Sequence, residues 1–255
     1  MKKYCVFGEK GGISTKLYLP EGFDVERDKC DMAIVMHGFV ASKSRYPVPK
    51  IASTLKKAGV AAITFDFDAH GSSEGEFVDM TIASEISDAR AVFEYVCSLP
   101  YVRDIFFVGH SQGGVVAGML AGMLCDENHE RTPKGLALLA PAAVLKDDAL
   151  RGVCMGSKYD PVNPPEYVKV LFHKLGRNFI KQAQVLPIYE TSWKYTGRVC
   201  LIHGTKDKIV PLSYSERYDE GYKNSELQVV DGLGHFMRSW GKDVPGMVRD
   251  FICRH

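Results

Sequence analysis

One serine of the chain, Ser111, lies in a setting that suits a nucleophile. It is the centre of the stretch GHSQGG, residues 109–114, which follows the apolar run Ile105–Val108 and precedes a run of small residues. A strand, a Gly-x-Ser-x-Gly turn and a helix in this order predict a sharp corner that lifts the serine hydroxyl above a sheet. The glycines of the motif remove side chains that such a corner cannot hold. An incidental glycine-rich turn is the alternative, because Gly-x-Ser-x-Gly alone is a weak pattern.

A serine nucleophile needs a base within hydrogen-bond reach and a carboxylate that orients the base. In the strand-turn-helix arrangement, the acid and then the histidine follow the serine along the chain, each in a loop after a strand. Asp207 follows the run VCLI at 199–202, and His235 lies in the loop DGLGHF at 231–236. These residues are the predicted acid and base. A turn-forming or helix-capping role is the alternative for Asp207, with Asp231 as a rival acid nearby.

Seven other histidines compete with His235 for the role of base. His110 is adjacent to Ser111 in sequence, so its side chain is expected to point away from the serine. The remaining six fit turn, lid or terminal positions: His37, His70, His129, His173, His203 and His255. Among the eight, His235 alone combines the required chain order with a loop position.

The charge that develops on the substrate oxygen during acyl transfer needs two donors, normally backbone N–H groups. The N–H of Gln112, directly after the serine, is the first candidate. The N–H of Phe39 is the second, because the turn at 37–39 follows an early apolar strand. An ordinary turn is the alternative explanation of the His-Gly pair in that segment.

The composition argues against several other functions. The chain has 32 Lys and Arg against 31 Asp and Glu, without blocks of like charge, so neither nucleic acid nor a membrane surface is an expected partner. We recognise no secretory leader and no membrane-length apolar segment. The seven cysteines are scattered without CxxC spacing, which favours reduced thiols in a cytoplasmic protein. Metal-ligand and nucleotide-binding motifs are missing, so neither a metal nor a cofactor is predicted.

Short apolar runs alternate with helical patterns, which is typical of βαβ units around a mainly parallel sheet. The clearest strands are Ala33–Met36, Ala61–Phe65, Ile105–Val108, Leu136–Leu139 and Val199–Ile202, with Ser14–Leu19 as an antiparallel edge strand. Helices are predicted at Val48–Ala58, from Ile82 to near Pro100, and at Gln112–Leu124, Ser213–Tyr222 and Val244–Ile252. We expect one domain over residues 1–255.

Residues 143–189 break this alternation. They hold four prolines, mixed charge and many aromatic residues, without a helical or a strand period. A connection of this length inside a compact domain is usually functional, so the segment is predicted to be an inserted lid. A pair of ordinary surface helices is the alternative.

With these motifs, the chain resembles the α/β-hydrolase serine esterases, and among them the bacterial cinnamoyl or feruloyl esterases. The matching pieces are HGF at 37–39, FDFDAHGSSEG at 65–75, GHSQGG at 109–114, DDALRG at 147–152, LPIYE at 186–190, LIHGTKDKIVP at 201–211 and GLGHF at 232–236. The resemblance implies an α/β-hydrolase fold: a mostly parallel eight-stranded sheet flanked by helices, with a small cap over the serine. It also implies an enzyme that hydrolyses hydroxycinnamoyl esters through an acyl-enzyme intermediate, without a cofactor.

The resemblance assigns two residues of the lid to substrate binding. Asp148 occupies the position of a carboxylate that meets the phenolic hydroxyl of the acid in some members. Phe179 stands where some relatives have a tyrosine, so an aromatic slot is expected while recognition of the phenol stays open. A cap on a turn of the lid is the alternative role of Asp148.

Two other functions stay open at this point. A lipid or monoacylglycerol-type esterase or acyltransferase would use the same three residues. A hydrolase-fold protein that binds a ligand without turnover would usually lack one of them, and all three are present. As partners we expect a small-molecule ester with an aromatic acyl group, and the sequence allows a homodimer.

Overall fold

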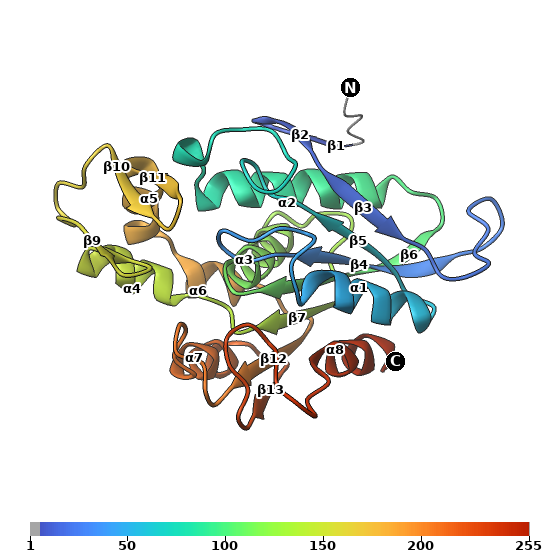
Figure 1. The fold of residues 1–255 in the computed structure, drawn as a ribbon. Coiled ribbons are helices and arrows are strands. Elements are labelled where there is room, and N and C mark those ends of the chain that lie inside the picture. The colour runs from blue at the N-terminus through green and yellow to red at the C-terminus, as the bar shows by residue number, and fades with distance from the viewer. Residues whose placement is uncertain (1–5, 255) are drawn as a thin grey trace.

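A seven-stranded sheet forms the centre of the computed structural model, which describes residues 6–254 (Figure 1). The strand order is β13-β12-β7-β6-β4-β5-β3. In that order the strands are Ser225–Val230, Arg198–Gly204, Gly135–Leu139, Val102–His110, Cys30–Met36, Ala61–Phe65 and Thr15–Tyr18. All neighbours are parallel except the edge strand β3, which pairs with β5 antiparallel. The predicted α/β class is confirmed, while residues 1–5 and 255 of the predicted domain lie outside the described residues.

The main sheet has seven strands, where the resemblance implied eight. The short strands β1 (Val6–Gly8) and β2 (Gly11–Ile13) pair with each other and form a separate hairpin. Strand β1 packs against helix α2 (Ile82–Cys97) instead of extending the sheet edge. The backbone of Gly12 exchanges hydrogen bonds with Glu74 instead of with a strand of the main sheet, so the hairpin adds no strand there.

Helices cover both faces of the sheet because its strands are apolar on both sides. Helices α1 (Val48–Lys57) and α8 (Val244–Cys253) pack on one face, and α2 and α3 (Gln112–Asp126) pack on the other (Figure 1). Helix α7 (Ser213–Gly221) packs against β12 and β13. All five predicted helices are present, with ends within three residues of the prediction.

The predicted lid segment, 143–189, is built from short elements between β7 and β12. They are α4 (Val144–Arg151), β8 (Val153–Cys154), β9 (Ser157–Lys158), β10 (Tyr167–Val170), β11 (His173–Gly176), α5 (Arg177–Val185) and the start of α6 (Ile188–Ser192). Two antiparallel hairpins, β8–β9 and β10–β11, stand apart from the main sheet. In Figure 1 these hairpins, α4 and α5 lie to the left of the central sheet.

Two further findings concern the described residues only. Within 6–254, no helix has the length and apolar character needed to cross a bilayer. The six cysteines of that range are free thiols. The expectation of a reduced thiol at Cys5 falls outside the described residues.

Candidate active site

Ser111 occupies the corner between β6 and α3, with φ 57° and ψ −122°. A positive φ is sparsely populated for residues other than glycine, so the backbone is strained at this position. The chain accommodates the corner because its neighbours lack side chains. A Cβ on Gly109 would lie 2.2 Å from the Gly113 carbonyl oxygen, and a Cβ on Gly113 would lie 2.3 Å from the His37 carbonyl oxygen. The structure therefore has the sharp strand-to-helix turn that the motif predicts.

Ser111, His235 and Asp207 come together from three separate loops. His235 Nε2 lies 3.0 Å from Ser111 Oγ, and His235 Nδ1 lies 2.8 Å from Asp207 Oδ2. Ser111 and His235 are each only 7% exposed. These two hydrogen bonds link the hydroxyl to the imidazole and the imidazole to the carboxylate. Such an arrangement allows a proton to move from the hydroxyl to the ring.

Asp207 is held by more groups than its sequence context indicates. Its Oδ1 accepts hydrogen bonds from the N–H groups of Ile209 and Val210, at 2.8 and 2.9 Å. Its Oδ2 lies 3.3 Å from His203 Nε2 as well as near His235. Burial raises the pKa of the Asp207 carboxyl, but the hydrogen bonds from His203 and His235 outweigh burial and hold that pKa below its usual range. The turn-forming role and the contact with His235 thus coexist, because they use different oxygens.

Two histidines near the site have contacts that the sequence reasoning missed. His110, expected to point away from Ser111, places its Nε2 2.8 Å from the carbonyl oxygen of His235. His203, assigned a turn role, contacts Asp207 and also has its Nδ1 2.7 Å from Ser215 Oγ. The available signal was their position at the ends of β6 and β12, since the carboxyl ends of parallel strands meet at one edge.

Phe39 and Gln112, whose amides are the predicted oxyanion donors, line the same pocket as Ser111. Gln112 is the first residue of α3, so its N–H has no acceptor within the helix. A Cβ on Gly38 would lie 2.9 Å from Ser111 Cβ and 3.4 Å from Ser111 Oγ, so the chain leading into Phe39 passes directly against the serine. The role of the two amides as oxyanion donors stays a prediction.

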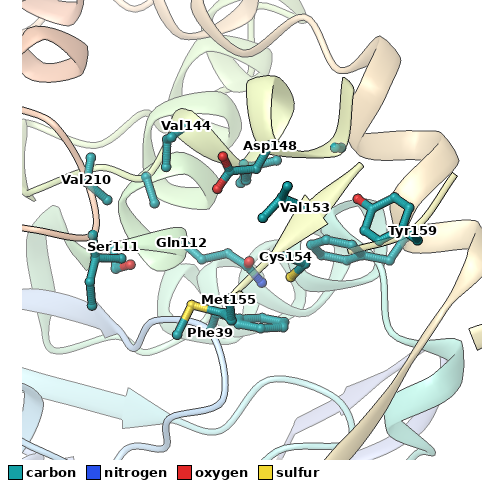
Figure 2. Close-up of a pocket in the computed structure, with 15 residues that line it drawn as sticks. Phe39, Ser111, Gln112, Val144, Asp148, Val153, Cys154, Met155, Tyr159 and Val210 are labelled. Atoms are coloured by element: carbon teal, nitrogen blue, oxygen red, sulfur yellow. The ribbon is translucent and has the colours of Figure 1, made fainter. Parts of the chain in front are cut away.

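A largely apolar pocket extends from Ser111 beneath the 143–189 segment (Figure 2). Its lining includes Phe39, Gln112, Val144, Asp148, Val153, Cys154, Met155, Tyr159, Phe179 and Val210. Figure 2 shows Ser111 and Tyr159 at opposite ends, with the Asp148 carboxylate directed into the space between them. We call this space the acyl pocket, because the resemblance predicts that an acyl group binds near Ser111.

Both residues of the predicted lid that the resemblance singled out, Asp148 and Phe179, line the acyl pocket. Phe179 is buried, and its ring centroid lies 5.9 Å from that of Phe39. Asp148 Oδ1 also accepts a hydrogen bond from Arg151 at 2.5 Å, so part of its carboxylate is engaged within α4. Tyr159 was missed, because nothing in its local sequence indicates that the residue following β9 faces this pocket. Burial raises the pKa of Tyr159 to about 12, so its hydroxyl stays protonated.

Gln112, which lines the pocket, also contacts a group of buried carboxyl side chains. Gln112 Nε2 donates a hydrogen bond to Glu85 Oε2 at 2.7 Å, and Glu85 is 0% exposed. Burial raises the pKa of Glu85 well above its usual value. Burial also raises the pKa of Asp68 to about 6, and burial together with the Asp68 charge raises that of Asp88 to about 7. The sequence reasoning did not single out these acids.

The substitution Asp88→Asn is expected to stabilise the protein more at pH 8 than at pH 4. Because its pKa is raised, the Asp88 carboxyl keeps its proton in the folded state above about pH 4, where the unfolded state loses that proton. The free energy of unfolding therefore falls as pH rises towards 7. Asparagine keeps an acceptor for the Asp68 N–H, which lies 2.6 Å from Asp88 Oδ2, and removes the titration. We expect a gain of about 1 to 3 kcal/mol at pH 8, measured by urea unfolding. The surface variant Asp250→Asn is the control, and a gain independent of pH would contradict the prediction.

Comparisons with known proteins find similarity at the level of family and fold. A family model described as the alpha/beta hydrolase family matches residues 33–240. The structure of Est1E from Butyrivibrio proteoclasticus with ferulic acid bound is 31% identical, covers 94% of this chain and 94% of that chain, and has a TM-score of 0.87.

Two curated proteins are more distant. The palmitoyl-protein thioesterase ABHD10, mitochondrial, of Mus musculus is 24% identical over 202 residues, which is 77% of this chain. Protein ABHD12B of Homo sapiens is 22% identical over 241 residues, 89% of this chain. The matched regions span 65% and 62% of those two proteins, which is less than two thirds of their length.

Proposed function

The chain belongs to the alpha/beta hydrolase family, and from that membership we propose that it is a serine carboxylic-ester hydrolase for aromatic, hydroxycinnamoyl-type esters. The observation that carries the proposal is the chain of hydrogen bonds, 3.0 and 2.8 Å long, from Ser111 through His235 to Asp207. Ser111 is the nucleophile, His235 the base and then the acid, and Asp207 the group that orients the imidazole. The amides of Phe39 and Gln112 are the oxyanion donors.

The reaction has two halves that use the same groups. In the first, Ser111 Oγ attacks the acyl carbon while His235 Nε2 takes the hydroxyl proton, and Asp207 stabilises the imidazolium. That proton then passes to the alcohol as the ester bond breaks. In the second half, the oxygen of a water molecule attacks the acyl carbon of the acyl-serine while His235 takes a proton from that water. His235 then returns the proton to Ser111 Oγ as the acid leaves. Neither half requires a cofactor.

The acyl pocket supports an aromatic acyl group. The rings of Phe39 and Phe179 line one region of it, and a flat substrate ring packs well against such side chains. Asp148 and Tyr159 bring the polar atoms that a ring hydroxyl would need at a distance from Ser111. The likeness to Est1E, whose structure holds ferulic acid, supports the same substrate class.

A panel of esters tests the substrate class. We expect kcat/KM for methyl ferulate and methyl cinnamate to exceed that for a medium-chain glycerol ester by at least about tenfold, because the pocket stabilises the transition state of one acyl shape over another. A palmitoyl thioester is the third substrate, chosen from the named activity of the mouse relative. Preference for the glycerol ester or the thioester would overturn the aromatic class and leave the triad untouched.

The substitution Tyr159→Phe is expected to discriminate between esters that differ by one ring hydroxyl. If Tyr159 hydrogen-bonds that hydroxyl, kcat/KM for methyl p-coumarate should fall about 5- to 30-fold, because a buried hydrogen bond contributes about 1 to 2 kcal/mol. The value for methyl cinnamate, which lacks the hydroxyl, should stay within about twofold. Tyr167→Phe is the matched control, since Tyr167 lies on β10 beneath the Lys174 ammonium and does not line the pocket. Equal losses on both esters would argue against this contact.

A further inference from the structure

The loop that carries His235 is tied to the rest of the protein on both sides of the histidine. Ahead of it, the Lys206 N–H donates a hydrogen bond to the Leu233 carbonyl oxygen at 2.9 Å. Beyond it, the Tyr46 hydroxyl donates to the Met237 carbonyl oxygen at 2.8 Å. Met237 has φ 57°, so the chain turns sharply just after the histidine. These ties hold the flanks of the loop, and a separate contact holds His235 itself.

That contact comes from His110. Its Nε2–H donates to the His235 carbonyl oxygen at 2.8 Å, although the two residues are 125 positions apart in the sequence. The two rings are neighbours as well, with centroids 5.1 Å apart. His110 is 7% exposed, so water competes little for this hydrogen bond. His110, directly before Ser111 in the sequence, thus holds the backbone of His235, whose ring faces Ser111.

The strand end that bears His110 is itself rigidly placed. It is the last residue of β6, which lies between β4 and β7 in the middle of the sheet. The next residue, Ser111, donates its N–H to the Leu139 carbonyl oxygen at 2.9 Å and accepts from the Ala142 N–H at 3.0 Å. The hydrogen bond from His110 therefore fixes the His235 loop relative to the central strands of the sheet.

We propose that His110 is a positioning residue for His235. It joins the backbone of the base to the strand that carries the nucleophile, and so sets the distance between His235 Nε2 and Ser111 Oγ. This rests on the proposed function, since it assigns His235 the role of base. A displacement of about 1 Å between reacting groups can lower a rate by about 100-fold, so a tie at this position matters for kcat.

The charge state of His110 suits this role. Burial, and then the neighbouring His235, lower the pKa of His110 to about 4. The hydrogen bond to the His235 carbonyl raises this pKa, but by less. The ring is therefore neutral at pH 7, with its proton on Nε2. A neutral donor holds the His235 backbone without adding a second positive charge beside the imidazolium that forms during attack.

The substitution pair His110→Phe and His110→Gln tests the proposal. Phenylalanine keeps a ring of similar size and removes the donor, whereas the glutamine amide can present an N–H close to the position of Nε2. We expect kcat on methyl ferulate to fall about 10- to 100-fold in His110→Phe, with KM within about threefold, and to return to within about fivefold in His110→Gln. Circular dichroism and the Tm establish that both variants are folded.

A spectroscopic readout separates positioning from a general structural role. The proton between His235 Nδ1 and Asp207 Oδ2, whose heavy atoms are 2.8 Å apart, should give a low-field proton NMR resonance. We expect this resonance in the wild type and in His110→Gln, and expect it to be broadened or shifted in His110→Phe. The measurement needs no substrate. A wild type without ester turnover would therefore refute the proposed function, while the resonance would still decide the role of His110.

The matched control is Tyr46→Phe. It removes the hydrogen bond to the Met237 carbonyl, two residues beyond His235, and leaves the histidine backbone tied to His110. We expect its kcat to stay within about twofold of the wild type. Wild-type kcat in His110→Phe, an unchanged resonance in that variant, or an equal loss in Tyr46→Phe would each overturn the proposal.

Discussion

Replacing Ser111 by alanine should lower kcat/KM for methyl ferulate by about 10⁴-fold or more, because the acyl-enzyme route loses its nucleophile. Residual turnover would come from the oxyanion donors and binding alone. The fold should persist, since alanine fits the space that serine occupies at the corner between β6 and α3. The measurement is steady-state kinetics, combined with intact mass after treatment with a fluorophosphonate. We expect one adduct on the wild type and none on the variant.

Ser213→Ala is the control for this experiment. Ser213 is an exposed residue at the start of α7, so its removal should change neither turnover nor labelling. Retained turnover in Ser111→Ala would end the nucleophile assignment. Absence of a fluorophosphonate adduct on the wild type would instead favour a hydrolase-fold protein that binds a ligand without hydrolysing it.

The substitution Asp207→Asn should lower kcat/KM by about 10³- to 10⁴-fold while the protein stays folded. A carboxylate accepts the Nδ1–H of His235, 2.8 Å away, and leaves Nε2 free to take the Ser111 proton. An amide that donates to Nδ1 would place the histidine proton on Nε2, where it blocks that transfer. The asparagine carbonyl can still accept from the N–H groups of Ile209 and Val210, so the turn is kept.

The same variant has an expected pH signature in stability. Because the pKa of Asp207 is depressed in the folded state, its ionisation stabilises the protein above about pH 4, the ordinary value for an aspartate, and this contribution is lost as pH falls further. The difference in Tm between wild type and Asp207→Asn should therefore be largest at neutral pH and shrink in acid. A constant difference between pH 7 and pH 3 would contradict this assignment.

Asp231→Asn is the matched control for the acid. Asp231 was the rival candidate, and its Oδ1 accepts a hydrogen bond from Thr205 Oγ1 at 3.0 Å. The His235 ring instead contacts Asp207. We expect kcat/KM within about twofold of the wild type, and a loss comparable to that of Asp207→Asn would reverse the assignment.

The central strands and the residues of the triad could be predicted from local patterns. A strand covered by helices on both faces needs an unbroken apolar run, and Ala61–Phe65 was identified with its observed ends for that reason. Ser111 was identified because the glycines around it reflect close backbone approaches within a few residues. The edge of the sheet was harder, since nothing local in Val6–Ile13 distinguishes a strand of the main sheet from a separate hairpin.

Sequence alone determined the class of fold, five of the helices and the order along the chain of Ser111, Asp207 and His235, because each depends on side-chain periodicity or on a short turn. Only the tertiary structure decided that His110 holds the His235 backbone, that His203 shares Asp207, and that Tyr159 lines the acyl pocket. The contact between His110 and His235 joins residues 125 positions apart. Its formation depends on how the strands and loops between them pack together, and no local pattern encodes a distance set by that packing.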